Sequence, residues 1–360
     1  MEQNKKIEGD NKLNSAFCVL IMAGGKGTRF WPKSTEEKPK QFISLTEERT
    51  MLQVTIDRIK KMLPIEKIFI ATGEKYMALV KEQIPDLPNK NIIMEPVGRN
   101  TAPCILLSSL YIKQIYNNCN ICVLPSDHLI KDENTFLNIL KDANGFVNNK
   151  KEVIITIGIN PDRPETGYGY IKYPKMDTHE RIKKVEKFVE KPDIEKAKQY
   201  LESKEYLWNA GMFIFNVDYM LKELENNYTT TYKLFNKLPS IDDKNYKNAL
   251  KEIYPQSEKI SIDFAVMEKS QNIYVIPADF GWDDIGTWKS LERYINKDEN
   301  NNVFKGNNIE CFNSNNCTVY GEKKRVILID VQDLFVIDGE DTIVVCKKDS
   351  IDKAKDFRKE

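Results

Sequence analysis

Short, unbroken apolar runs alternate with helix-like stretches through the first two-fifths of this 360-residue chain. Such runs are typical of strands covered on both faces, and their alternation with helices predicts a parallel sheet. Crossovers between parallel strands are right-handed, so we expect an open, doubly wound, mostly parallel α/β sheet of Rossmann-like form. The expected strands are residues 16–22, 68–72, 92–94 and 121–124, and the expected helices are 51–63, 76–84, 101–116 and 133–148.

The rest of the chain is mixed at first and changes character after residue 297. Residues 153–159, 168–173, 182–189 and 212–215 are expected strands, and 193–203 and 217–226 are expected helices. Residues 300–308 are Asn-rich and turn-like, and short β runs follow at 318–320, 326–329, 334–337 and 343–346. We therefore predict a main domain at 16–296 and a small C-terminal β domain at 297–360, with no internal repeat. The polar residues 1–15 are expected to be disordered.

The charge balance argues against a polyanionic partner. Lys plus Arg and Asp plus Glu are equal at 54 each, so bulk charge gives no support for nucleic-acid or membrane binding. No signal peptide and no membrane-spanning stretch is evident. One Cys-x-x-Cys pair, Cys119 and Cys122, stands without a second pair or a His cluster. Buried strand cysteines in a reducing cytoplasm are therefore favoured over a zinc site.

A loop with three glycines follows the first expected strand and ends at the cation Arg29. The backbone N–H groups of such a loop can approach phosphates closely. Phe30 stands where the dinucleotide fingerprint needs glycine, and the spacing of a P-loop is absent. Arg29 and the downstream Lys40 favour a triphosphate, because attack on its α-phosphate develops charge on the leaving pyrophosphate. An ordinary Gly-rich turn with solvated cations is the alternative.

The loop and several later segments resemble the signature of sugar-nucleotide pyrophosphorylases, and among them the bacterial enzymes that form GDP-mannose. The resemblance begins with Met22-Ala-Gly-Gly-Lys-Gly-Thr-Arg-Phe-Trp-Pro-Lys-Ser34, Pro39-Lys-Gln-Phe42, Glu95-Pro-Val-Gly-Arg-Asn-Thr-Ala-Pro103 and Leu124-Pro-Ser-Asp-His128. It continues with Gly167-Tyr-Gly-Tyr-Ile171, Phe188-Val-Glu-Lys-Pro192, Trp208-Asn-Ala-Gly-Met-Phe-Ile-Phe215, Ser261-Ile-Asp-Phe-Ala-Val-Met-Glu268 and Gly281-Trp-Asp-Asp-Ile-Gly-Thr-Trp288. The matches follow the family's order and cover about residues 16–294, so coincidence is implausible.

The resemblance implies a metal site built from two aspartates. Asp127 and Asp284 would bind Mg²⁺, which takes one or two carboxylates together with phosphate oxygens and water. Asp283 lies next to Asp284 and leaves the register open, with Asp284 favoured. Taken alone, Asp127 is also a plausible helix N-cap. His128 is expected to be structural, because the attacking phosphate oxygen is already ionised and needs no general base.

The implied sugar-phosphate site lies in the middle of the chain. Glu190 would accept hydrogen bonds from sugar hydroxyls, Lys191 would contact the sugar phosphate, and Asn209 would offer both a donor and an acceptor. Gly169 would let the sugar lie on bare backbone. Tyr168 is either a sugar contact or a core residue.

The base is implied to lie by the loop that opens the helix at residue 101. Asn100 would read guanine, with Ser126 assisting, because an amide matches the O6 acceptor and the N1/N2 donors. Thr101 is equally a natural helix N-cap. The implied nucleotide-binding set is Ala23, Gly24, Gly25, Gly27, Thr28, Arg29, Asn100, Thr101, Ser126 and Asp127.

The implied reaction joins GTP to α-D-mannose 1-phosphate and gives GDP-mannose and pyrophosphate. Arg29 and Lys40 would stabilise the leaving pyrophosphate, and Lys191 would hold the attacking phosphate. We expect a homodimer in the cytoplasm, with the β tail as a dimer contact or lid. The chain ends at Glu360, too early for the isomerase domain that some relatives carry, so we expect no phosphomannose isomerase activity.

Several alternatives stay open. The first keeps the chemistry and changes the base or the sugar. The second is a sugar-nucleotide glycosyltransferase, although such enzymes carry an Asp-x-Asp motif where this chain has Ser126-Asp-His128. The third is a non-catalytic regulatory subunit, which should have lost one or more of Arg29, Lys40, Asp127 and Asp284, all of which are present.

Overall fold

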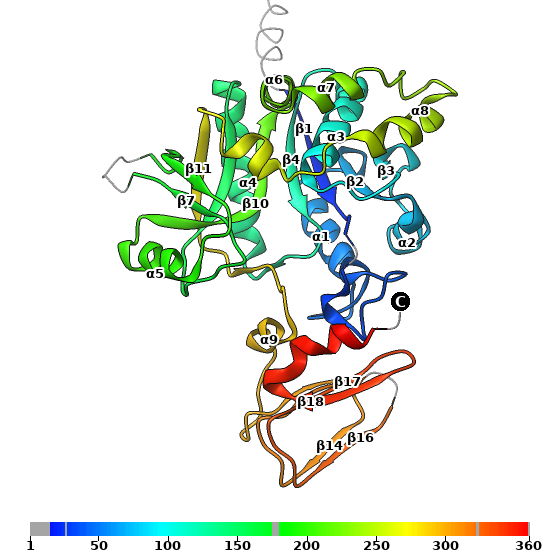
Figure 1. The fold of residues 1–360 in the computed structure, drawn as a ribbon, viewed down its shortest axis with the longest axis vertical. Helices are drawn as coiled ribbons and strands as arrows, with labels where there is room; N and C mark the ends of the chain where they lie inside the picture. The colour runs from blue at the N-terminus through cyan, green and yellow to red at the C-terminus, as the bar shows by residue number, and fades with distance from the viewer. Residues whose placement is uncertain (1–14, 26, 175–179, 322–323, 359–360) are drawn as a thin grey trace, which may run out of the picture. The chain divides into compact units, whose positions relative to one another are not determined.

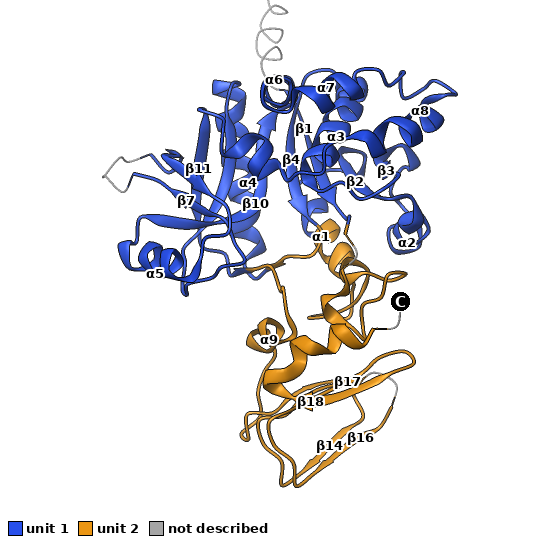
Figure 2. Ribbon diagram, in the orientation of Figure 1, with its two compact units in different colours: residues 1–24, 58–125, 130–282 blue, residues 25–57, 126–129, 283–360 orange. Residues whose placement is uncertain are grey.

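The computed structural model describes residues 15–25, 27–174, 180–321 and 324–358. Within these residues the chain forms two compact units, shown in blue and orange in Figure 2. Unit 1 comprises residues 1–24, 58–125 and 130–282, and unit 2 comprises 25–57, 126–129 and 283–360. The predicted disorder of residues 1–15 lies, apart from Ser15, outside the described residues.

Unit 1 is built on a ten-stranded sheet whose first four strands run parallel. Their spatial order is β3-β2-β1-β4, and they are β1 (Ala16–Met22), β2 (Ile68–Gly73), β3 (Ile92–Glu95) and β4 (Cys119–Pro125). All but the last residue of β2 and β4 and the central residues of β1 are buried, which explains why their sequences are largely apolar. The predicted α/β class is confirmed, and these strands begin and end within a few residues of the predicted positions.

The second half of the sheet contains one long strand, β10 (Tyr206–Asn216), which lies between β4 and β6 (Ile154–Ile159) and runs antiparallel to both. β11 (Ile273–Ala278) lies parallel to β6, and short antiparallel strands extend this side. They are β7 (Tyr170–Lys172), β8 (Lys183–Lys184) and β9 (Lys187–Val189), while β5 (Leu129–Ile130) and β12 (Trp282–Asp283) pair separately. Strand direction was not predictable here, because an apolar run reports burial and not orientation.

Helices cover the sheet of unit 1 (Figure 1). α3 (Thr101–Tyr116), α6 (Val217–Asn227) and α7 (Thr229–Phe235) share one large hydrophobic core with strand residues such as Leu20 and Val123. Side-chain carboxylate and amide caps begin several helices, as when Asp132 accepts from the N–H of Thr135 at 3.0 Å. Unit 1 also contains α2 (Met77–Gln83), α4 (Glu133–Lys150), α5 (Ile194–Ser203) and α8 (Tyr246–Ile253), while most of α1 (Met51–Lys60) belongs to unit 2. Neither α7 nor α8 was predicted.

The C-terminal strands of unit 2 stack as coils of a parallel β-helix. β13 (Val303–Lys305), β15 (Thr318–Tyr320) and β17 (Leu334–Asp338) lie parallel in one ladder, and β14 (Ile309–Phe312) and β16 (Val326–Ile329) in another. β18 (Ile343–Lys347) closes the first ladder in the antiparallel direction. β13 falls within the segment that we expected to be only turn-like.

The corners of this β-helix repeat, so the prediction of no internal repeat is wrong. Asn313 donates to Asp330 and Asn316 donates to Asp333, both at 2.6 Å and both 17 residues along the chain. All four corner residues have positive φ, which Asn and Asp tolerate better than other side chains. The repeat is not visible in the sequence, because strands of three to five residues preserve an apolar pattern and not the identity of each residue.

The core of unit 2 joins the β-helix to the segment after the glycine loop. Phe30, Ile43 and Leu45 pack in one buried cluster with Trp288 of α9 (Trp288–Leu291) and with Tyr320, Phe335, Ile337 and Ile351. The ring of Trp288 lies 5.0 Å from that of Phe30 and 4.8 Å from that of Tyr320. We keep the division at residues 296/297 as a proposal about domains.

Candidate functional site

The glycine loop approaches a second backbone segment where only glycine fits. Gly27 has φ 52°, and a Cβ there would lie 2.5 Å from the backbone nitrogen of Lys40. The backbone of Gly27 therefore lies directly against that of Lys40, and the 3₁₀ turn Thr28–Phe30 follows it. The side chain of Arg29 in this turn is exposed. At the start of the loop, the N–H of Ala23 donates to Ala71 at 2.8 Å and so is engaged within the fold.

Lys40 donates hydrogen bonds to both predicted metal ligands within unit 2. The side chain of Lys40 is 8% exposed, and its ammonium donates to the carboxylate Oδ2 and the backbone oxygen of Asp127, both at 2.9 Å. It also donates to the backbone oxygen of Asp284 at 2.6 Å. These bonds account for the three protons of the ammonium. Lys40 therefore organises the two aspartates as the structure stands, and a phosphate contact would replace one of these bonds.

The charges around Asp127 favour its ionised form. Burial acts to raise the pKa of Asp127, but the charge and hydrogen bond of Lys40, with help from Arg29, keep that pKa below its usual value. Burial lowers the pKa of the neighbouring His128, so its imidazole is neutral at physiological pH. The site thus presents a carboxylate and not an acid, as a metal ligand must.

Asp283 and Asp284, between which the sequence left the choice of metal ligand open, have different environments. Asp283 is 2% exposed, and its carboxylate accepts from the N–H of Ile285 at 2.7 Å. It also accepts from Arg293 at 2.7 Å and from the hydroxyl of Tyr294 at 2.8 Å. Asp283 therefore has a structural set of partners. The carboxylate of Asp284 instead lies over Gly286, where a Cβ would be 3.0 Å from Oδ2.

The residues fit Mg²⁺. Asp127 and Asp284 would supply hard oxygen ligands from the same unit, and Lys40 bonds the carboxylate of Asp127 and the backbone oxygen of Asp284. Among the described residues there is no group of three or more His, Cys, Asp or Glu with metal-binding geometry. That finding is compatible with Mg²⁺, which usually keeps several waters and takes further ligands from substrate phosphates.

A second constellation lies in unit 1 and contains the predicted sugar contacts. A Cβ on Gly169 would lie 2.7 Å from Oε2 of Glu190, so the carboxylate faces bare backbone. The N–H of Asn209 donates to the carbonyl of Gly169 at 2.8 Å. The side chain of Glu190 is 6% exposed and pairs with the ammonium of Lys191, which is itself exposed. The structure therefore brings Gly169, Glu190, Lys191 and Asn209 together.

Tyr168 belongs to an aromatic cluster beside this constellation. Its ring meets those of Trp208 and Trp282 edge-on at 5.2 and 5.1 Å. The guanidinium of Arg163 lies 4.8 Å from the ring of Trp208, and Tyr168 is buried. Of the two readings that the sequence left open, packing in the core is the one that these contacts support.

The predicted base-binding residues have mixed environments. Asn100, not Thr101, caps α3: its side chain accepts from the N–H of Thr101 at 2.9 Å. Thr101 uses its hydroxyl to accept from the N–H of Ile262 at 2.8 Å. In unit 2, Ser126 is buried, and its carbonyl accepts from Thr55 at 3.2 Å. Their roles in binding guanine stay predictions.

Sequence reasoning missed Asp263 and Thr156, which flank Asn209. The amide nitrogen of Asn209 donates to Asp263 Oδ1 at 3.0 Å, and its oxygen accepts from Thr156 at 3.0 Å. Burial and the charge of Glu190 raise the pKa of Asp263 to about 6. Asp263 stands in the quoted Ser261-to-Glu268 motif, and that signal could have identified it. Thr156, inside an apolar strand, carries no such signal.

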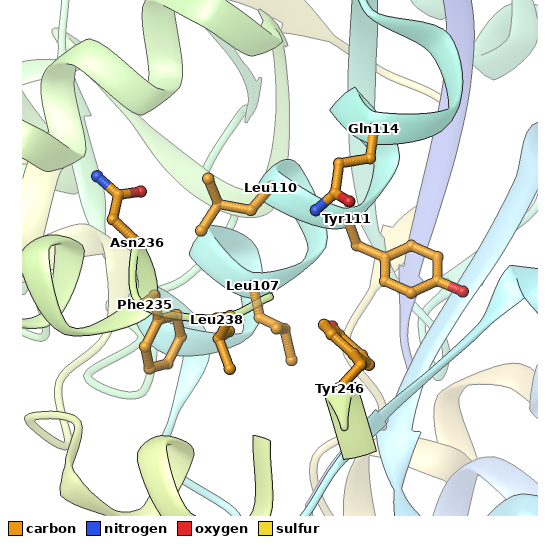
Figure 3. Close-up of a pocket in the computed structure, with 8 residues that line it drawn as sticks. All are labelled: Leu107, Leu110, Tyr111, Gln114, Phe235, Asn236, Leu238 and Tyr246. Carbon is orange, nitrogen blue, oxygen red and sulfur yellow. The ribbon is translucent and has the colours of Figure 1, made fainter. Parts of the chain in front are cut away.

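A small pocket elsewhere in unit 1 contains none of the predicted site residues. It has a volume of about 150 Å³ and lies beside α3, α7 and α8 (Figure 3). Apolar side chains such as Leu107 and Phe235 line it together with two tyrosines and the amides of Gln114 and Asn236. All seven cysteines are unpaired, and no described helix is long and apolar enough to cross a membrane.

Comparisons with known proteins match both units. Residues 18–301 match the family described as nucleotidyl transferase, and residues 306–359 match the MannoseP isomerase/GMP-like beta-helix domain. A mannose-1-phosphate guanylyltransferase of Salmonella montevideo is 40% identical over 296 residues, which cover 80% of this chain and 62% of that protein. The chain spans less than two-thirds of the length of the curated relatives that it matches first.

Solved structures agree on the fold. The crystal structure of a mannose-1-phosphate geranyltransferase from Thermus thermophilus has a TM-score of 0.84 and 31% identity, over 94% of this chain and 97% of that one. The crystal structure of a mannose-6-phosphate isomerase from Helicobacter pylori has a TM-score of 0.60 and 26% identity, over 74% of this chain and 99% of that one.

Proposed function

We propose that this chain, which belongs to the nucleotidyl transferase family, joins GTP to α-D-mannose 1-phosphate and gives GDP-mannose and pyrophosphate. The observation that carries the proposal is the bridge from Lys40 to Asp127 and Asp284 beside the glycine loop. It holds the carboxylate of Asp127 and the backbone of Asp284 on one buried cation, and two carboxylates beside a cationic loop would suit phosphoryl transfer. The name of the Salmonella montevideo relative supports the choice of guanine and mannose.

The reaction needs positioning and charge neutralisation more than acid–base catalysis. An ionised oxygen of the sugar phosphate attacks the α-phosphorus of GTP and forms a new P–O bond. The bond from that phosphorus to the oxygen bridging the β-phosphate breaks, and pyrophosphate leaves with its electron pair. When bound, Mg²⁺ supplies charge neutralisation at the phosphates. Because the attacking phosphate oxygen is already ionised, the step requires no general base.

On the nucleotide side, the cationic loop is assigned to the triphosphate. Arg29 is exposed and extends from the turn that Gly27 seats against Lys40, so it is the cation assigned to the leaving pyrophosphate. Lys40 contributes by fixing Asp127 and Asp284. Asn100, Thr101 and Ser126 stay assigned to guanine. A fixed charge that meets developing charge lowers the barrier without reorganisation.

On the sugar side, a buried carboxylate and an exposed ammonium are assigned to different parts of mannose 1-phosphate. Glu190 lies against the bare backbone of Gly169, where a flat sugar face fits, and its oxygens accept from hydroxyls. Lys191 is exposed and is assigned to the phosphate. A phosphate that engages Lys191 would compete with Glu190 for the ammonium.

The test is pyrophosphate release with Mg²⁺ from a panel of four nucleoside triphosphates and several sugar 1-phosphates. The proposal expects the highest kcat/KM for GTP with mannose 1-phosphate. A different best pair would contradict the substrate assignment and keep the mechanism. Absence of release with every pair would contradict the enzyme assignment itself. A separate assay, which follows conversion of mannose 6-phosphate to the ketose phosphate, tests for isomerase activity, and none is expected.

The proposal includes a homodimer and a cytoplasmic location. Exposed apolar side chains of the β-helix offer a dimer contact, and they are Phe312, Ile327, Ile329, Ile343 and Val345. Seven unpaired cysteines are compatible with a reducing compartment. Light scattering coupled to size exclusion tests the dimer: a mass near twice 41.8 kDa is expected, and a monomer at micromolar concentration would contradict it.

A further inference from the structure

One short segment of unit 1 contacts both predicted sugar-recognising residues. It is the π-helical turn Asp263–Met267 with the following Glu268. Asp263 accepts from the side-chain amide of Asn209 at 3.0 Å, and Glu268 accepts from the backbone N–H of Glu190 at 3.3 Å. Single π-helical turns occur frequently at functional sites. This turn therefore has the position from which Asn209 and Glu190 can be oriented together.

The contacts of Asn209 determine which part of its amide remains for a ligand. Its Oδ1 accepts two hydrogen bonds, from the hydroxyl of Thr156 at 3.0 Å and from the N–H of Gly211 at 3.1 Å. An amide oxygen has two lone pairs, so its acceptor capacity is filled. The nitrogen donates one proton to Asp263 and has a second N–H bond. Asn209 is therefore arranged as a donor.

Asp263 is the group that fixes this arrangement against rotation of the amide. A flipped amide would place its oxygen against the carboxylate of Asp263 and its N–H groups against the N–H of Gly211. Both contacts would be repulsive or unpaired, which is costly for partly buried groups. Thr156 alone would not select the orientation, because a hydroxyl both donates and accepts.

We propose that Asp263 is a positioning residue for sugar recognition: it orients Asn209 so that the second amide N–H donates to a hydroxyl oxygen of the sugar 1-phosphate. The inference rests on the proposed function and deepens it. Glu190, against Gly169, supplies the acceptor on the same ligand. Asn209 would thus donate to one sugar oxygen, and Glu190 would accept from another hydroxyl. A deoxy sugar that lacks the oxygen bound by Asn209 is expected to bind more weakly than the full sugar phosphate.

The test is a double-mutant cycle between Asp263→Ala and Asn209→Ala, with KM measured for mannose 1-phosphate and for GTP. Each single variant is expected to raise the KM for the sugar phosphate by roughly tenfold, the scale of one lost hydrogen bond to a well-placed partner. The KM for GTP is expected to change by less than about twofold. Because Asp263 acts through Asn209, the double variant is expected to match Asn209→Ala alone.

Two further variants separate positioning from a general loss of structure. Asp263→Asn keeps an oxygen that accepts from Asn209, so the KM for the sugar phosphate is expected to stay within about threefold of wild type. Asp242→Ala, which removes the charge of an exposed aspartate outside the π-helical turn, is the control for charge removal. Additive effects in the double variant, an equal rise of both KM values, or an Asp263→Asn variant as weak as Asp263→Ala would overturn the inference.

The inference and the proposed function fail in different ways. The same cycle is measured by calorimetric binding of mannose 1-phosphate, which needs no turnover. If sugar phosphate binds but no pyrophosphate is released, the proposed function is wrong, and the binding cycle still decides the role of Asp263. If none of the sugar 1-phosphates binds the wild-type protein, both are overturned.

Discussion

The ammonium of Lys40 lies 2.9 Å from the carboxylate Oδ2 of Asp127, and the same nitrogen reaches the backbone oxygen of Asp284 at 2.6 Å. Lys40 and Asp284 are separated by 244 residues in sequence, so the bond joins the glycine-loop segment to the start of the C-terminal part. A buried lysine with its three protons engaged is a structural link as well as a charge. The predicted role of Lys40 as a pyrophosphate cation is therefore incomplete without its role in organising the metal ligands.

Lys40→Ala is expected to raise the Mg²⁺ concentration needed for half-maximal activity and to lower kcat by about 10²-fold or more, the scale of losing a preorganised charge. The cause is the loss of the bridge to Asp127 and Asp284. Titration of turnover with Mg²⁺ measures both quantities. Lys38→Ala, an exposed lysine of the same loop, is the matched control. An unchanged Mg²⁺ dependence in Lys40→Ala would contradict the organising role.

Asp284→Asn and Asp283→Asn are expected to have opposite effects on activity and stability. Asp284→Asn should abolish turnover with little change in stability, because it removes the assigned metal ligand. Asp283→Asn should lower the free energy of unfolding by on the order of 2 kcal/mol, since it weakens charged hydrogen bonds to Arg293 and Tyr294. Denaturant unfolding and turnover of both variants decide this. The reverse pattern would move the ligand to Asp283.

Substitutions of Tyr320 test whether the β-helix stabilises the segment that follows the glycine loop. Its ring packs against Trp288, which packs against Phe30, and Tyr320→Ala should cost about 3–5 kcal/mol of unfolding free energy together with turnover. Its buried hydroxyl has no hydrogen-bond partner among the described residues. Tyr320→Phe should thus leave stability unchanged or raise it. A fully active Tyr320→Ala protein would show that the loop is independent of the β-helix.

Asp263 gives a pH dependence of stability whose sign follows from its pKa. Burial and the charge of Glu190 raise that pKa from 3.8 to about 6, while Lys191 acts in the opposite direction. Between pH 4 and 6 the folded state binds more protons at Asp263 than the unfolded state, so this group makes stability fall as pH rises. The destabilisation by ionised Asp263 reaches its full size about one pH unit above its folded pKa of about 6.

The matched variant for this effect is Asp263→Asn, which cannot ionise. Its stability relative to wild type is expected to increase from pH 4 to pH 7, by at most about 3 kcal/mol at 1.36 kcal/mol for each pKa unit. Urea unfolding at pH 4, 5, 6 and 7 measures the difference. A difference that stays constant or decreases with pH would mean that the carboxyl is not destabilised by folding.

The sequence predicted those elements whose signal is local. α3 was predicted at 101–116 and lies at Thr101–Tyr116, because a polar cap precedes it and Asn117 and Asn118 follow it. β1 was predicted with equal success from one apolar run. The antiparallel direction of β10 and the coils of the β-helix were missed, since both depend on pairing between distant segments.

The same division applies to the candidate site. Motifs identified Asp127, Asp284, Glu190 and Asn209 as candidates, because each stands in a recognisable string of residues. The partners of these residues were not accessible in that way. Three contacts depend on the three-dimensional structure: Asp283 accepts from Arg293, Lys40 donates to Asp284, and Asn209 donates to Asp263.

The most direct test of the central claim follows the phosphorus atoms by ³¹P NMR during incubation of the protein with GTP, mannose 1-phosphate and Mg²⁺. The account predicts equal amounts of GDP-mannose and pyrophosphate, no products when mannose 1-phosphate or Mg²⁺ is withheld, and none with Asp284→Asn. Release of pyrophosphate without a sugar nucleotide, or undiminished turnover in Asp284→Asn, would contradict it.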